Sequence, residues 1–226
     1  MRILALETST LAGGVALLEN GRVVGQVLHD VALTHSERLM AMVDRLLEDC
    51  GWGLDGLGGL ALSIGPGSFT GLRVGAATVK GLALVLDVPV APVPTLDALA
   101  AVLPFADGPV CPLLDARKGE VYVAVYRWAE ERMHRLTDYL ALPPEAAVDW
   151  IPAGGIALGD GVAACRPYLA RRDGDVRLAP AAQSIPSAAV VGQLGHAMLA
   201  AGQGISGNDV EPLYLRPSEA ELRRRA

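Results

Sequence analysis

Residues 63–86 read SIGPGSFTGLRVGAATVKGLALVL, and they join the end of an apolar strand to a helix through a glycine-proline turn. The pattern predicts a strand over 57–64 and a sharp turn at Gly65-Pro66-Gly67. The helix is expected to begin between Ser68 and Thr70, because a serine or threonine oxygen can accept hydrogen bonds from free N–H groups of a first helical turn. A strand, a tight turn and a long apolar helix in this order indicate an α/β fold.

The helix that follows the turn is apolar or small on almost every side. At about 100° per residue Arg73 and Lys80 fall on one line, and a helix of this kind must be covered all round. A glycine inside a helix costs about 1 kcal/mol relative to alanine, which makes sense where two backbones approach closely. Either the helix is the middle layer of a large core, or one face docks on a partner chain. The face opposite the two cations holds Gly71, Gly75, Thr78 and Leu82.

The composition is that of a globular protein of 226 residues, which suits one large domain or two small ones. The sequence holds no uninterrupted apolar run of about 18 residues, so no membrane span is predicted. The first residues reach Glu7 too soon for a signal peptide and read as a strand. Three widely spaced cysteines fit small buried side chains in a reducing cytoplasm. The net charge of −6 argues against a surface that itself binds nucleic acid.

The first half of the chain reads as strands followed by helices. Asn20-Gly21 predicts a type I′ hairpin turn, and Thr34 to Glu37 read as a capping box for a helix that ends at Cys50. The other elements expected here are strands over 2–6, 13–19, 22–28 and 87–93 and a helix over 95–102, before a linker over 103–109.

The second half repeats the order of the first. A strand over 110–114 ends at Asp115, and a polar turn leads to an alternating strand over 121–128, as Glu7 and its loop lead to the second strand. We therefore expect two related α/β lobes, each a mixed sheet with flanking helices, over 1–104 and 105–226; whether the terminal helix packs back on the first lobe stays open. The remaining elements expected are helices over 143–150, 161–169, 187–201 and 218–225, a strand over 154–158 and an extended segment over 210–216.

Few residues suggest chemistry. The glycine turn could bind an anion at the helix N-terminus, but Thr70 stands where a phosphate-binding loop or a dinucleotide fingerprint needs glycine, so a structural turn is favoured. Glu7 and Asp115 each end a strand, where they could hold a metal or lie in solvent as loop residues, and the second reading is preferred. The histidines have no ligand spacing, and no serine or cysteine has the context of a nucleophile.

Four segments resemble the TsaB (YeaZ) family, the inert relatives of TsaD in the synthesis of threonylcarbamoyladenosine (t6A) at position 37 of tRNAs. They read ILALETST, GPGSFTGLRVGAATVKGLALVLDVPVAPVPTLDALA, DARKGEVYVAVYR and PLYLR. The resemblance covers nearly the whole chain, and GPGSFTGLRVG followed by KGLAL is specific to the TsaB/TsaD superfamily. It implies two ribonuclease-H-like, actin-like (ASKHA) lobes.

The resemblance also implies that chemistry takes place on TsaD. The two metal-binding histidines of the catalytic relative fall at Thr95 and Leu99, and neither residue supplies an imidazole. Glu7 stands where the family most often has aspartate. The expected protein is a non-catalytic scaffold with no cofactor of its own, while ATP and metal act on TsaD.

The partner interface implied by the resemblance uses helices 35–49 and 70–86, which would bind TsaD, or a second copy of this chain in its absence. TsaE would join through TsaD, tRNA contact would be indirect, and the complex would lie in the cytoplasm, not in a membrane. The alternatives are a glycoprotease-like or kinase-like enzyme of the same fold, or a self-associating regulator with nucleotide at a dimer seam. The expected interface residues are His35, Arg38, Met42, Arg45, Gly71, Arg73, Val74, Gly75, Thr78 and Leu82. Vestigial or seam nucleotide contacts would be Glu7, Thr8, Ser9, Gly67, Ser68 and Asp115.

Overall fold

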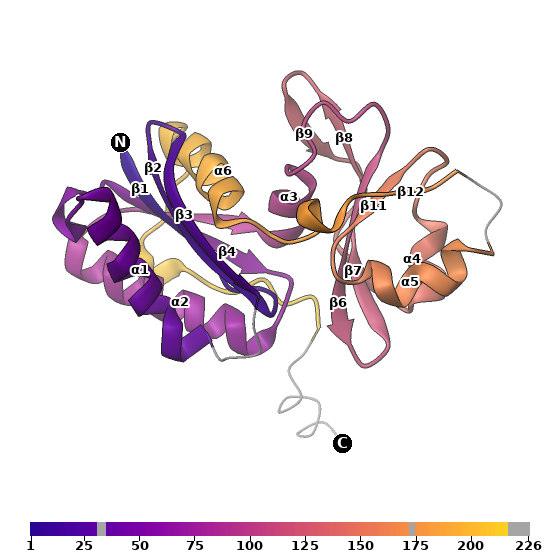
Figure 1. The fold of residues 1–226 in the computed structure, drawn as a ribbon, viewed down its shortest axis with the longest axis horizontal. Helices are drawn as coiled ribbons and strands as arrows, with labels where there is room; N and C mark the ends of the chain where they lie inside the picture. The colour runs from indigo at the N-terminus through magenta and orange to yellow at the C-terminus, as the bar shows by residue number, and fades with distance from the viewer. Residues whose placement is uncertain (31–34, 172–174, 217–226) are drawn as a thin grey trace. The chain divides into compact units, whose positions relative to one another are not determined.

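The computed structural model describes residues 1–30, 35–171 and 175–216, which form two compact units (Figure 1). Unit 1 comprises Met1–Ala98 and Pro186–Leu213; unit 2 comprises Leu99–Ile185 and the described residues 214–216. The predicted boundary between 104 and 105 lies close to the first division, but it assigned 186–213 to the second lobe. That segment belongs to unit 1 because its helix, α6 (Ala188–Ala200), packs on the sheet of unit 1.

Unit 1 is built on a five-stranded mixed sheet with the order β3-β2-β1-β4-β5. Its strands are β1 (Arg2–Glu7), β2 (Ala12–Glu19), β3 (Arg22–Asp30), β4 (Gly59–Gly65) and β5 (Val90–Pro94). The first three pair antiparallel, and β4 pairs parallel with both β1 and β5. The type I′ turn between β2 and β3 is confirmed, because Asn20 and Gly21 have φ of 51° and 80°.

Helices cover both faces of this sheet (Figure 1). On one face lie α1 (His35–Cys50) and α2 (Phe69–Leu86), packed on alternate residues of β1, β2 and β4; α6 covers the other face. Ser68 caps α2 as predicted and accepts a hydrogen bond from the Gly71 N–H at 3.3 Å. Unit 1 also contains the short helix η1 (Leu54–Gly56), most of α3 (Thr95–Ala100) and η3 (Gly207–Asp209). The predicted capping box at 34–37 lies outside the residues whose side chains the structure describes.

Unit 2 repeats the pairing scheme of unit 1. Its central strands run in the order β10-β7-β6-β11-β12. Across the sheet, two antiparallel pairs are followed by two parallel pairs, as in unit 1. The internal repeat and the predicted fold class of two mixed α/β lobes are therefore confirmed. The elements are β6 (Val110–Arg117), β7 (Glu120–Val123), β10 (Leu140–Leu142), α4 (Pro144–Asp149), β11 (Ile156–Leu158), α5 (Val162–Leu169), β12 (Arg177–Leu178) and η2 (Ala181–Gln183).

One expected strand of unit 2 is wrong. Residues 121–128 were expected to form a single strand, but they divide between β7 and β8 (Tyr126–Ala129). The two halves have different partners: β7 pairs with β6 and β10, whereas β8 pairs with β6 and with β9 (Arg132–Arg135). The predicted helix over 218–225 lies outside the described residues.

Candidate functional site

The loop after β1 packs directly on the glycine turn that precedes α2. The Ser68 N–H donates to the Ser9 carbonyl oxygen at 2.6 Å. A Cβ added to Gly67 would lie 2.3 Å from the same oxygen, and one added to Gly75 would lie 2.4 Å from Thr8 Oγ1, so both positions require glycine. Two N–H groups at this helix start are thus engaged by the protein itself, that of Ser68 by Ser9 and that of Gly71 by the Ser68 side chain, which favours a structural turn.

Five of the expected nucleotide contacts come together at this loop and turn. Glu7, Thr8 and Ser9 are at most 1% exposed, and Glu7 Oε1 accepts a hydrogen bond from the Ser9 N–H at 2.6 Å. Gly67 is half-buried and Ser68 is exposed. The Thr8 and Ser9 hydroxyls are buried and, within the described part of the chain, have no hydrogen-bond partner. A nucleotide role for this cluster remains a prediction.

The sixth expected contact, Asp115, belongs to unit 2. Its carboxylate accepts a hydrogen bond from the Arg117 N–H at 2.7 Å and lies 3.2 Å from the Arg117 guanidinium. Its own N–H donates to the Asp160 carboxylate at 2.8 Å. These contacts engage the acid within its own unit, and the described residues contain no group of three or more side chains suited to hold a metal.

Thr95 and Leu99 have packing roles here, at the positions where the family resemblance implies metal-binding histidines in the catalytic relative. Thr95 is fully buried, its Oγ1 lies 2.8 Å from Ser63 Oγ, and it accepts a hydrogen bond from the Gly65 N–H at 3.1 Å. Leu99 is also fully buried. Thr95 therefore stabilises the end of β4, at the point where the chain turns toward α2.

The outer face of α2 is an uncovered, largely apolar surface of unit 1. It consists of Arg73, Ala77, Gly81, Leu84 and Val85, all exposed, and we call it the outer α2 face. Leu84 and Val85 are 76% and 82% exposed, and a Cβ added to Gly81 would meet nothing within 4 Å. The Arg73 guanidinium lies over the Phe69 ring at 3.8 Å.

The length and composition of α2 alone would allow it to cross a membrane, and no other described helix has this property. Its opposite side, however, is part of the core of unit 1. Six of its residues pack against that unit and are buried: Gly71, Leu72, Gly75, Ala76, Val79 and Ala83. One side of α2 is thus a layer of the fold, and the other side is uncovered.

The structure places the predicted interface residues at different depths. Gly71, Gly75 and Met42 are buried within unit 1, so none of the three lies on its exposed surface. Val74, Thr78, Leu82 and Arg38 are half-buried. Arg73 and Arg45 are exposed, and Arg45 pairs with Asp49 at 2.9 Å. The side chain of His35 is not among those that the structure describes.

Four residues of the outer α2 face were absent from the predicted interface: Ala77, Gly81, Leu84 and Val85. A usable signal was present in the sequence, because they share the side of the helix that carries Arg73. The two cations of this otherwise apolar helix, Arg73 and Lys80, mark the side that meets water.

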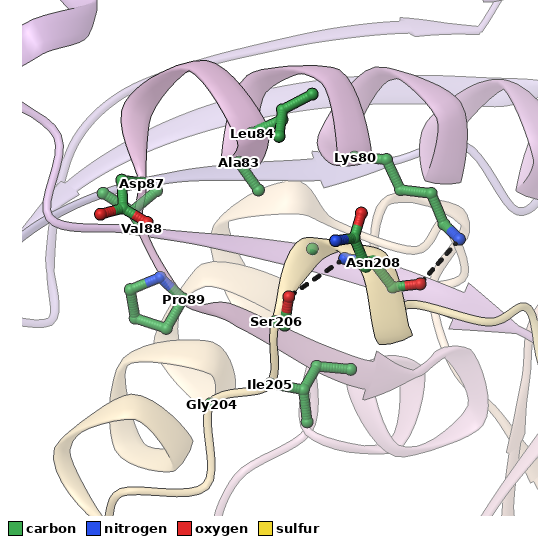
Figure 2. Close-up of a pocket in the computed structure, with 11 residues that line it drawn as sticks. Lys80, Ala83, Leu84, Asp87, Val88, Pro89, Gly204, Ile205, Ser206 and Asn208 are labelled. Carbon is green, nitrogen blue, oxygen red and sulfur yellow. Dashed lines mark hydrogen bonds between the residues drawn. The ribbon is translucent and has the colours of Figure 1, made fainter.

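A groove of about 370 Å³ lies beside the C-terminal half of α2 (Figure 2). The end of the helix forms one wall, and the segment that contains η3 forms the other. Lys80 Nζ donates to the Asn208 carbonyl oxygen at 3.1 Å across it, and Ser206 Oγ accepts from the Asn208 N–H at 3.3 Å. The groove continues the outer α2 face, since Leu84 belongs to both. Its lining is Lys80, Ala83, Leu84, Asp87, Val88, Pro89, Gly204, Ile205, Ser206, Gly207 and Asn208.

Comparison with known proteins identifies the relatives of the chain. The family model "TsaD: tRNA N6-adenosine threonylcarbamoyltransferase" matches residues 23–169. The tRNA threonylcarbamoyladenosine biosynthesis protein TsaB of Escherichia coli K12 is 33% identical over 231 residues, which cover 97% of this chain and 96% of that protein. Its counterpart in Haemophilus influenzae is 31% identical over 233 residues, 96% of this chain and 94% of that protein. The Bacillus subtilis TsaB is 39% identical over 128 residues, which span 57% of this chain and 56% of that protein.

Solved structures agree with these matches. YeaZ from Pseudomonas aeruginosa aligns with a TM-score of 0.80 at 32% identity over 95% of this chain and 99% of that one. A protein described as similar to peptidase YEAZ from Pseudomonas aeruginosa aligns with a TM-score of 0.81 at 33% identity, with the same coverage. The activator of 2-hydroxyisocaproyl-CoA dehydratase from Clostridium difficile shares only the fold, with a TM-score of 0.54 at 8% identity over 95% of this chain and all of that one.

Proposed function

The chain belongs to the TsaB (YeaZ) family of tRNA threonylcarbamoyladenosine biosynthesis proteins, and we propose that it is a non-catalytic scaffold of t6A synthesis that binds and stabilises TsaD. The reaction assisted is transfer of the threonylcarbamoyl group to N6 of adenosine 37. ATP and metal act on TsaD, TsaE joins through the TsaB–TsaD complex, and the assembly works in the cytoplasm.

The observation that carries this proposal is the outer α2 face. Exposed leucine and valine side chains at the end of a helix that is otherwise part of the core are unfavourable in water, and a partner that covers them gains about 25 cal/mol per Å² of apolar area. Ala77 and Gly81 in the middle of the face allow a second helix to approach closely. We expect a helix of TsaD to pack on this surface, whereas the sequence left open which face of helix 70–86 meets the partner.

The neighbouring helix extends this surface. α1 lies beside α2 on the same face of the sheet (Figure 1). It exposes Met40 and Ala41. Two adjacent helices with uncovered small and apolar positions suit a bundle with two helices of the partner. Arg45 and the acids of α1 would lie at the polar rim of such an interface.

A non-catalytic role is supported by what occupies the expected reactive positions. The glycine turn is packed against the loop after β1, Thr95 and Leu99 serve packing, and Asp115 is engaged by its neighbours. We therefore place the chemistry on TsaD.

A co-purification experiment tests the docking surface. Leu84→Glu places a charge on the outer α2 face and should abolish co-purification with TsaD, while the fold survives because the side chain is largely exposed. Val24→Glu makes the same change at an exposed position of β3 and should leave the complex intact. Retention of the complex by Leu84→Glu would remove α2 from the interface.

Two other functions predict different behaviour of the isolated chain. A glycoprotease-like or kinase-like enzyme would hydrolyse peptide or turn over ATP without TsaD. A self-associating regulator would form a homodimer through the same α2 surface, and ATP would shift its mass in solution. We expect the scaffold to form a homodimer when it is alone and the homodimer to dissociate when TsaD is added.

A further inference from the structure

Comparison of the two units shows which part of unit 2 the shared fold does not need. In unit 1 the two residues Asn20-Gly21 connect β2 to β3. In unit 2 the corresponding strands β7 and β10 are separated by residues 124–139, which contain the β8–β9 hairpin. Val123 and Leu140 face each other in register, so a two-residue turn could join them. The β8–β9 hairpin is therefore an insertion between β7 and β10 that the pairing of these two strands does not require.

The hairpin carries an exposed aromatic contact. Phe105, from the segment before β6, is 79% exposed, and its ring centroid lies 4.9 Å from that of Trp128 on β8. Phe105 also has φ of 62°, a conformation that is rare for a bulky residue and that concentrates at functional sites. Burial does not explain why a large ring is held in this position.

The other face of the hairpin carries two arginines. Arg127 faces His134 across the ribbon, and Arg132 lies two residues before His134, so both guanidinium groups belong to one face. Both are exposed, and within the described part of the chain neither forms an ion pair with a carboxylate, although Arg132 Nε donates a hydrogen bond to His134 Nε2 at 3.2 Å. Like charges at diagonal positions repel each other, and a bound anion would relieve the repulsion.

The acids of the hairpin lie in its turn. Glu130 and Glu131 have φ of 50° and 62°, and Glu130 Oε2 lies 3.9 Å from His134 Nε2, so one carboxylate borders the arginine face, while the arginines themselves lie on the strands. The net charge of −6 is also unevenly divided. Unit 1, residues 1–98 and 186–213, carries six basic and twelve acidic residues, and the rest of the chain carries thirteen of each. The acidic balance that argued against nucleic-acid binding is therefore a property of unit 1 alone.

We infer that the β8–β9 hairpin with Phe105 is an RNA-binding surface, on which unpaired bases stack against Phe105 and Trp128 and phosphates bind Arg127 and Arg132. Stacking on aromatic side chains and charge contacts to the backbone are the usual means of binding looped RNA. β9 pairs only with β8 in the described chain, so an RNA strand can cross its free edge and reach both faces. This goes beyond the proposed scaffold role, and it replaces the expectation of purely indirect tRNA contact.

The test is binding of the full chain to a fluorescent stem-loop RNA with an unpaired loop, measured by anisotropy over a range of salt concentrations. The double variant Arg127→Ala/Arg132→Ala should bind about tenfold more weakly, and the slope of log K against log salt should fall by about 1.4, which corresponds to two phosphate contacts on a single strand. Phe105→Ala should weaken binding by a similar factor without changing the slope.

A matched control separates this surface from general charge. Arg22→Ala/Arg166→Ala removes two exposed arginines from β3 and α5 and should bind RNA as the unchanged chain does. Absence of RNA binding by the chain, or equal effects of the two double variants, would overturn the proposal. So would hairpin variants that lose a protein partner and keep RNA.

The outcome is distinguishable from that of the scaffold proposal. Leu84→Glu should leave RNA binding unchanged, since α2 takes no part in this surface. If Leu84→Glu loses TsaD while the hairpin variants bind RNA normally, only the RNA surface fails.

Discussion

At the scale of single residues, two glycines of the same helix have opposite environments. A Cβ at Gly75 would lie 2.4 Å from Thr8 Oγ1 and 3.0 Å from Leu62 Cδ1, whereas one at Gly81 would meet nothing within 4 Å. Sequence alone treats the two alike. The difference arises because α2 presses one side against the loop after β1 and leaves the other side open.

Alanine substitution at these two positions should therefore act in opposite directions. We expect Gly75→Ala to lower the free energy of unfolding by about 1–3 kcal/mol through overpacking. Gly81→Ala should raise it by up to about 1 kcal/mol through helix propensity. Urea denaturation of both variants measures this, and equal effects would show that α2 is packed differently.

The cysteines offer a second test at this scale. Burial raises the pKa of the Cys165 thiol from 9.0 to about 11, and Cys111 is also fully buried, whereas Cys50 is half-exposed. Because the folded state holds the Cys165 proton more tightly, its stabilising contribution is present below the unfolded pKa and is lost as the pH rises through about 11.

Alkylation of the native protein at about pH 8 should therefore modify Cys50 first. The buried thiols of Cys111 and Cys165 should react only after denaturant is added. Mass spectrometry of the modified sites reports the order. Rapid modification of Cys165 in the folded chain would contradict its burial.

At the scale of elements, periodicity predicted the extent of α2 but not the side of it that packs on the sheet. Its extent and its Ser68 cap followed from local chemistry. Which side met the sheet did not, because nearly every position is apolar or small, and the glycines fit an external contact as well as an internal one. The line of cations favours one side as the exposed one, and the packing of Thr8 and Leu62 against Gly75 decides between the two.

The β8–β9 hairpin shows a different limit. Residues 121–128 alternate in a way that is typical of one strand, but a change of partner divides them, and β9 reads RMHR, which has no strong strand preference. Pairing between distant segments decided this region, and the insertion became visible only when the two units were compared.

The turn of the hairpin provides the prediction for this scale. Glu130 and Glu131 both have positive φ, which is disfavoured for residues other than glycine and asparagine. Replacing them with Asn-Gly should raise the free energy of unfolding by about 1 kcal/mol. It should also strengthen RNA binding, because two acids leave the tip. Thermal unfolding and anisotropy measure the two effects, and a less stable variant would contradict the turn geometry.

At the scale of the whole molecule, the repeat of strand, acid, loop and strand was enough to predict two related lobes. The shared pairing order of the two sheets confirms it. The return of residues 186–213 to unit 1 could not be predicted, because α6 is apolar enough to pack on either sheet. The expected site was also only partly predictable: the loop and turn residues come together in unit 1, but the exposed side of α2 required the packing of the core.

The central claim is that this chain assists a reaction that it does not carry out. Reconstitution of t6A formation on unmodified tRNA, with and without the chain, tests it most directly. We predict that the chain alone forms no t6A and turns over no ATP, that TsaD and TsaE form t6A only when it is added, and that Leu84→Glu fails to support the reaction. Substrate turnover by the isolated chain, or full t6A formation in its absence, would contradict the account.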